Sequence, residues 1–212
     1  MAEPEPRARS LTGTAVGTAR TEIRRHIHDL LSDDFTLRAE SIEELEKFGA
    51  AAADEIVQTL KTKCVDPHAS SSLTDALEEI GKPATAALIH ALTHVAEVTS
   101  PREAYLLENL IDTLGRLDDR RTAAILAGQL TKLNRAIRKN GNHALTDVCE
   151  ATRVRIHECL ADMGDRRALN DLIRMLGDGR KRVRDGVVDA LARIGERRAL
   201  TPMLRLYAVE DE

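Results

Sequence analysis

Aromatic side chains are almost missing from this sequence. Its 212 residues include two Phe, two Tyr and no Trp. Strands favour aromatic and β-branched side chains, and no stretch alternates apolar and polar residues as a half-buried strand does. The hydrophobic fraction of 42% comes mostly from Ala, Leu, Ile and Val. The composition therefore predicts an all-α core of closely packed helices.

Cysteines and long apolar runs are also scarce. The three cysteines, Cys64, Cys149 and Cys159, have no CxxC spacing. Such a set argues against a disulfide framework or a structural zinc site and is typical of a reducing compartment. No apolar run reaches the roughly 18 residues of a membrane span, and the N-terminal MAEPEPRARS does not resemble a signal peptide. These absences predict a cytoplasmic protein without a membrane partner.

The sequence does contain a recurring unit of a helix, a glycine and a second helix. Each unit has a glycine directly after an apolar residue, as expected at a helix C-terminus: Gly49, Gly81, Gly115, Gly164 and Gly195. The steps between them are 32, 34, 49 and 31 residues, and the long step indicates an insertion within residues 135–152. A unit of this size cannot bury its apolar faces alone, so neighbouring units must stack.

The two ends of the chain lie outside this pattern. Residues 1–17 are rich in Pro, Thr, Gly and Ala without an apolar period, which predicts a flexible tail. Residues 18–31 predict an unpaired first helix, and residues 210–212 an acidic tail. Residues 18–209 are therefore expected to form a single solenoid domain.

The last two units resemble a known repeat family. The family pattern is an acidic residue, Val-Arg, Ala-Leu-x-x-apolar-Gly, a turn and Arg-Ala-Leu. It is met by Asp178, Val183-Arg184, Ala190-Leu191, Ile194-Gly195 and Arg198-Ala199-Leu200. Residues 153–209 thus resemble HEAT repeats of the short bacterial type, also found in phycobilisome-linker lyase relatives, and residues 34–135 do so more weakly. The resemblance implies a right-handed α-solenoid of about five HEAT-like hairpins, with the second helices on a concave face. Such repeats serve as binding scaffolds in unrelated settings.

Charge is divided unevenly along the chain. Residues 1–100 contain 10 Lys and Arg against 17 Asp and Glu, whereas residues 101–212 contain 21 against 18. Three of those 18 acids are the last three residues. A basic C-terminal half on a mildly acidic protein indicates a charged partner.

The basic residues gather on the face of the second helices that points away from their apolar residues. In the first two units this face is acidic or neutral, with Asp54, Glu55, Gln58, His90, Thr93 and Glu97. In the later units it is basic, with Arg121, Lys132, Arg135, Lys139, Arg167, Arg174, Arg198 and Arg205. These eight residues are here called the basic stripe. We expect no acidic residue to interrupt the stripe in the third and fifth units. The stripe predicts a binding site for an acidic protein surface or segment. The alternative is that these Lys and Arg side chains only form a solvated outward face and bind no partner.

Two other functions stay open. Phosphate contacts need only Lys and Arg, and alkylpurine glycosylases of HEAT-like fold cradle DNA on a basic concave face, so a DNA backbone is an alternative ligand. Base capture usually needs stacking aromatic side chains, which are few here. A bilin-lyase-like subunit is the other alternative, from fold analogy alone.

No group of residues predicts catalysis. His157-Glu158 is a single His-Glu pair, whereas the iron hydroxylases of this fold combine several, so the pair is interpreted as an ordinary helix-surface pair. His90 and His94 lie four residues apart but have no third ligand at useful spacing. We therefore expect no catalytic residue, no metal site, no cofactor and a non-enzymatic protein.

Overall fold

The computed structural model describes residues 13–95, 97–117, 119–139, 143–177 and 181–210. These residues form eleven α-helices and three short 3-10 helices, and no strand is found among them. In chain order they are α1 (Gly13–Leu30), α2 (Phe35–Phe48), α3 (Ala50–Lys63), α4 (Pro67–Ile80), η1 (Lys82–Ala84), α5 (Thr85–His94), α6 (Pro101–Arg116), η2 (Arg120–Thr122), α7 (Ala123–Lys139), α8 (His143–Asp162), α9 (Arg166–Met175), α10 (Lys181–Ile194), η3 (Arg197–Ala199) and α11 (Leu200–Glu210). None of these helices combines the length and apolar character needed to cross a membrane.

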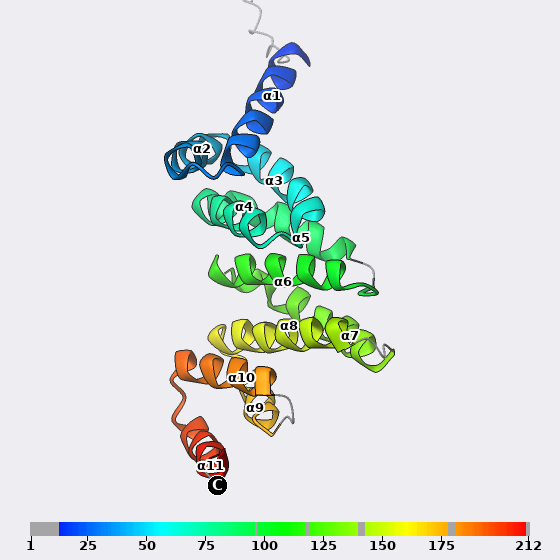
Figure 1. The fold of residues 1–212 in the computed structure, drawn as a ribbon, viewed down its shortest axis with the longest axis vertical. Helices are drawn as coiled ribbons and strands as arrows, with labels where there is room; N and C mark the ends of the chain where they lie inside the picture. The colour runs from blue at the N-terminus through cyan, green and yellow to red at the C-terminus, as the bar shows by residue number, and fades with distance from the viewer. Residues whose placement is uncertain (1–12, 96, 118, 140–142, 178–180, 211–212) are drawn as a thin grey trace, which may run out of the picture.

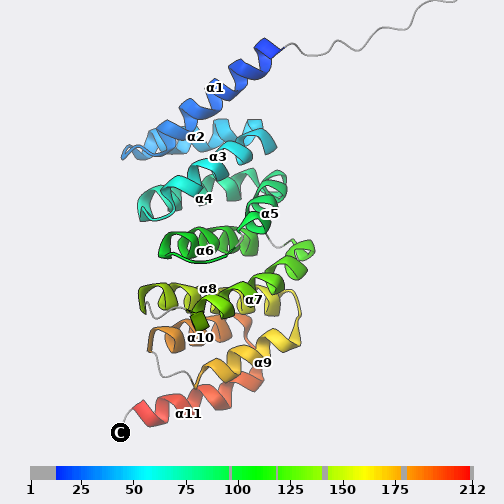
Figure 2. The same ribbon diagram turned by 90° about the vertical axis from the view of Figure 1, so that its right-hand side faces the viewer.

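The helices stack in one direction, from α1 at one end to α11 at the other (Figure 1). The first helices of successive units contact each other along the stack, α2 with α4, α4 with α6, α6 with α8, and α8 with α10. The second helices lie to one side of this row, as seen for α3, α5 and α7 in Figure 1 and for α5, α7 and α9 in Figure 2. The prediction of an all-α solenoid is confirmed.

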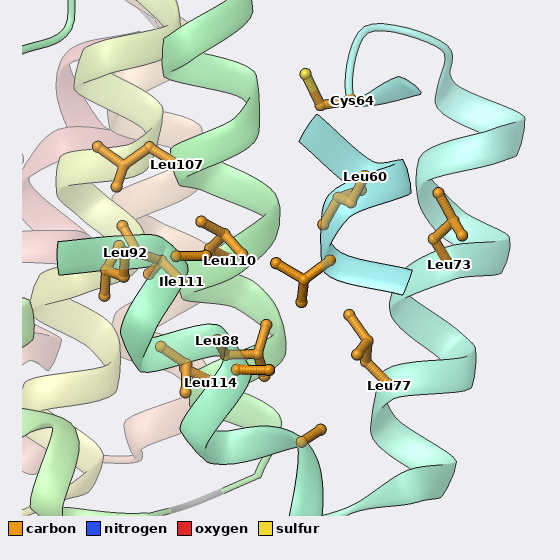
Figure 3. Close-up of a cluster of buried hydrophobic side chains, with 14 of the residues drawn as sticks. Leu60, Cys64, Leu73, Leu77, Leu88, Leu92, Leu107, Leu110, Ile111 and Leu114 are labelled. Carbon is orange, nitrogen blue, oxygen red and sulfur yellow. The ribbon is translucent and has the colours of Figure 1, made fainter. Parts of the chain in front are cut away.

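Leucine, isoleucine and alanine fill the space between the helices. In the close-up, Leu60 of α3, Leu77 of α4, Leu88 of α5 and Leu110 of α6 lie in one cluster between the four helices (Figure 3). A second cluster around Leu172 joins α8, α9 and α10. Aliphatic side chains of small and medium size fill the space between closely packed helices, and this core needs few aromatic residues.

The helix ends have local causes. The carboxylates of Asp34 and Asp66 accept backbone N–H groups in the first turns of α2 and α4. Ser100 and Glu103 form a reciprocal capping box at the start of α6. Four of the five predicted stops, Gly49, Gly81, Gly164 and Gly195, have φ values of 53°, 70°, 92° and 67°, which favour glycine.

Gly115 was wrongly predicted as a helix stop. It lies inside α6, which continues to Arg116, and it is not among the described glycines with positive φ. A Cβ added there would collide with Cys159 Sγ on α8, so glycine is needed for the close approach of α6 and α8. The long glycine step reflects extended helices on either side of residues 140–142: α7 has 17 residues and α8 has 20.

The predicted first helix begins earlier than expected. Residues 13–17, assigned to the tail, form the start of α1, while residues 1–12 and 211–212 lie outside the described part of the chain. Ile23, Ile27 and Leu30 are buried on the inner face of α1. The helix packs on α2 and α3 and so covers the apolar end of the first hairpin.

Leu191 tests the assignment of the C-terminal core. Its side chain on α10 is 2% exposed, within the cluster around Leu172. We expect Leu191→Ala to lower the free energy of unfolding by about 2–5 kcal/mol, because it leaves a cavity. The matched control is Leu204→Ala on α11, where the leucine is 67% exposed. Urea melts that show equal effects for the two variants would contradict this core assignment.

Candidate functional site

The eight residues of the basic stripe lie on second helices and on the 3-10 turns that precede them. Arg121 is on η2, Lys132, Arg135 and Lys139 are on α7, Arg167 and Arg174 are on α9, Arg198 is on η3, and Arg205 is on α11. All are exposed except Lys132, which is half-buried. The structure brings three of them together at one place.

That place is a pocket of about 50 Å³ on α7, here called the α7 pocket. Lys132, Arg135 and Lys139 line it together with residues 97–99. Residues three, four and seven apart share one face of a helix, so the three cations face the loop between α5 and α6. The pocket therefore concentrates positive charge on one face of α7.

The loop opposite α7 is held in place from within. Val98 is buried, and both the hydroxyl and the backbone N–H of Thr99 donate to Glu103 Oε2 at 2.7 Å. Burial alone would raise the pKa of Glu103, but hydrogen bonds from Thr99 and Ser100 outweigh it and lower the pKa below its usual value. Glu103 thus stays charged and fixes the loop to the start of α6.

The cations of the α7 pocket are only partly neutralised. Lys132 Nζ donates to the backbone carbonyl of Val95 and fixes α7 to the end of α5. Arg135 Nη1 lies 3.6 Å from Glu97 Oε1, with both side chains more than half exposed, so this pair is weak. Lys139 has no ion-pair partner within the described residues. Three cations against one loosely held carboxylate leave a surplus of positive charge.

Elsewhere the stripe is less basic than predicted, because three of its arginines pair with a nearby acid. The pairs are Arg121–Asp119, Arg174–Asp171 and Arg198–Glu196. The side-chain hydrogen bond from Arg121 is the main cause that lowers the pKa of Asp119 to about 2. The expectation that no acid interrupts the third and fifth units is wrong. Asp119 and Glu196 precede the 3-10 turns before α7 and α11, so the face of those helices does not include them. Arg167 and Arg205 have no such partner within the described residues.

At the N-terminal end of the same face, two arginines of α1 pair with Glu55 of α3. Arg20 Nε and Arg24 Nε lie 2.6 Å and 2.9 Å from the two carboxylate oxygens of Glu55. Burial raises the pKa of Glu55, and the hydrogen bonds from Arg24 and Arg20 outweigh this effect, so the net shift is downward. Glu55 is therefore engaged within the chain and is not available to a partner.

The sequence analysis missed a chain of ion pairs that runs along the first helices. It links Glu78 of α4, Arg116 and Asp112 of α6, Arg155 and Glu158 of α8, and Arg193 of α10. The five N–O distances between successive members lie at 2.6 Å or 2.7 Å. This ion-pair chain connects four consecutive first helices through their charged side chains.

The α8 part of the ion-pair chain is its most buried part. Glu158 is 2% exposed, and it accepts from Arg155 on its own helix and from Arg193 on α10. The interpretation of His157-Glu158 as a surface pair is therefore wrong, because α8 is covered on several sides. Burial also lowers the pKa of His157, which favours its neutral form. The spacing of Arg155 and Glu158, three residues apart, was the available signal for a helical ion pair.

One comparison with known proteins matches part of the chain. Residues 141–212 match a family model described as HEAT repeats. The matched segment contains α8, α9, α10 and α11, and the match supports a HEAT-repeat protein. No curated protein matches the sequence.

Several histidine and cysteine side chains of the helical stack are engaged within the chain or buried. No group of three or more His, Cys, Asp or Glu that could hold a metal occurs among its described residues. His94 Nδ1 lies 2.7 Å from the backbone carbonyl of His90, so one ring nitrogen is already engaged. Burial raises the pKa of Cys149 and of Cys159 to about 11, which keeps both thiols protonated at neutral pH.

Glu158→Gln tests the ion-pair chain. The variant removes the charge between Arg155 and Arg193 and leaves the largely buried Arg155 guanidinium short of a partner. We expect the free energy of unfolding to fall by about 3–5 kcal/mol, as when one member of a buried pair is lost.

The control for this substitution is Glu44→Gln, which breaks an exposed pair with Lys47 at the same three-residue spacing. Its urea midpoint should stay close to that of the parent, because exposed pairs contribute little. Equal midpoints for the two variants would mean that the ion-pair chain does not hold the first helices together.

Proposed function

We propose that this protein is a non-enzymatic scaffold that binds an acidic protein surface or segment on the basic stripe, with the α7 pocket at its centre. The observation that carries the proposal is the convergence of Lys132, Arg135 and Lys139 on one pocket. A helical-repeat scaffold for protein interaction is also what HEAT repeats suggest.

Electrostatics favour this part of the stripe over the rest. Arg121, Arg174 and Arg198 each have an acid beside them, so their fields cancel at short distance. The α7 cations lie within two helical turns and add their fields at one point. A local surplus of one sign steers an oppositely charged partner and raises the association rate.

The nucleic-acid alternative has less support. The same cations would contact phosphates, but the α7 pocket has no aromatic side chain for stacking on a base. Phe48 and Tyr105 pack on the core, and the exposed Phe35 lies on α2, in the row of first helices. The relation to short bacterial repeats of lyase relatives, and with it the bilin-lyase alternative, rests on sequence resemblance.

The double variant Arg135→Glu/Lys139→Glu tests the proposal. It changes the local charge by four units without altering any core residue, and both side chains are exposed. We expect the association rate with fluorescein-labelled poly-L-glutamate to fall about tenfold or more at low salt and less at high salt. Folding should be unaffected, since exposed substitutions change stability little.

The matched control is Arg25→Glu/Lys63→Glu, which makes the same charge change at exposed positions outside the stripe. If both double variants bind poly-L-glutamate as the parent does, the stripe is only a solvated surface. A 20-base-pair DNA duplex serves as the second probe. Tighter binding of this duplex than of poly-L-glutamate at equal salt, lost in the stripe variant alone, would favour the nucleic-acid alternative.

A further inference from the structure

A second cavity lies beside the α7 pocket and differs from it in chemistry. This cavity, here called the α5 groove, has a volume of about 540 Å³ and lies between the ends of α3 and α5 and the start of α6. Its apolar lining is Ala91, Val95 and Leu106. Lys61, His94 and Glu103 also line it, so its charged groups are of both signs. The groove is large enough for an apolar side chain and a short length of backbone.

The two cavities are neighbours across one loop. Glu97 and Thr99 line both of them. Hydrogen bonds hold the helices around both cavities in place. Arg102 Nη2 donates to the carbonyl of Lys61 at 2.9 Å and connects α6 to α3. Lys132 donates to the carbonyl of Val95 and connects α7 to α5. A site whose walls are held in place before binding loses less entropy when a ligand arrives.

We propose that the α5 groove and the α7 pocket form one two-part site, which binds a protein segment that has an apolar residue next to an acidic one. This inference rests on the proposed function and specifies the segment that the scaffold recognises. The apolar side chain packs on Ala91, Val95 and Leu106 in the groove. The neighbouring carboxylate enters the α7 pocket and pairs with Arg135 and Lys139.

The charges around the two cavities determine which residue goes where. Glu103 lines the groove and repels a second carboxylate there, and the hydrogen bonds from Thr99 and Ser100 keep Glu103 in place. In the α7 pocket the incoming carboxylate replaces Glu97, whose side chain is 56% exposed and swings into solvent easily.

The lining of the two cavities supports a peptide over a nucleic acid. The α7 pocket has no aromatic side chain on which a base could stack. In the α5 groove, Ala91, Val95 and Leu106 suit an apolar side chain, and Glu103 repels a phosphate. The chemistry of the two cavities together therefore fits a short acidic and apolar segment of a partner protein.

Three fluorescein-labelled peptides built on a Gly-Ser chain test this inference by fluorescence anisotropy. One contains a leucine followed by three glutamates, one has serine in place of that leucine, and one keeps the leucine but has serines in place of the glutamates. We expect the first to bind the parent protein about tenfold more tightly than the second, because its leucine side chain is partly buried in the groove. The third should bind more weakly than either.

Protein variants separate the two cavities. Leu106→Gln should remove the preference for the leucine peptide and leave binding of the serine–glutamate peptide nearly unchanged, because it adds no charge. Because Leu106 also touches the core, Val95→Ser provides a second, milder variant with the same expected direction. Lys139→Glu should weaken both glutamate peptides, whereas Arg138→Glu, the adjacent exposed residue outside the pocket, should weaken them less.

The outcomes distinguish this inference from the proposed function. Equal binding of both glutamate peptides by the parent, unchanged in Leu106→Gln and Val95→Ser, overturns the two-part site and leaves the basic stripe as the binding surface. Equal effects of Lys139→Glu and Arg138→Glu overturn the role of the α7 pocket. If neither glutamate peptide binds the parent at low salt, the proposed function fails together with the inference.

Discussion

Contact between neighbouring first helices is the interaction on which the rest of this structure depends. Each hairpin has an apolar face that only the next hairpin covers, and the row from α2 to α10 supplies that cover without interruption. The helices α6 and α8 approach closely where Gly115 leaves room for Cys159. Asp112 and Arg155 join the same two helices by an ion pair at 2.7 Å. Packing and electrostatics thus act on the same pair of helices.

The two rows of helices use charge in opposite ways. On the first helices, acids and arginines alternate across the stack and neutralise each other, as in Glu78, Arg116 and Asp112. On the second helices, α7 has cations that face a loop with a single carboxylate, Glu97. A charge that is already paired and partly buried attracts a binding partner only weakly. Within the basic stripe, α7 is therefore the place where several weakly paired cations lie together.

Local sequence patterns predicted the features that depend on neighbouring residues. They did not predict contacts between residues that lie far apart in the chain. The apolar spacing of the helices and the stops at Gly49 or Gly81 follow from neighbouring residues, and both are present. Gly115 has the same local pattern but a different cause, a side chain 44 positions later at Cys159. Helical projection also found Lys132, Arg135 and Lys139, because all three belong to one helix. It could not place residues 97–99 opposite them, since that position depends on the burial of Val98 and on the Ser100–Glu103 cap.

The α7 pocket is also connected to the row of first helices. The helix α7 packs on α8, and Arg153 Nη1 of α8 donates to Asn134 Oδ1 of α7 at 3.4 Å. Arg153 is in turn held by Glu150 at 2.7 Å on its own buried helix. The position of the α7 cations is thus set by α8, the helix that also holds the centre of the ion-pair chain. A charge change on the exposed face of α7 leaves this support intact, whereas a change inside α8 alters the support and the pocket together. Loss of binding without loss of stability is therefore the signature of the α7 surface itself.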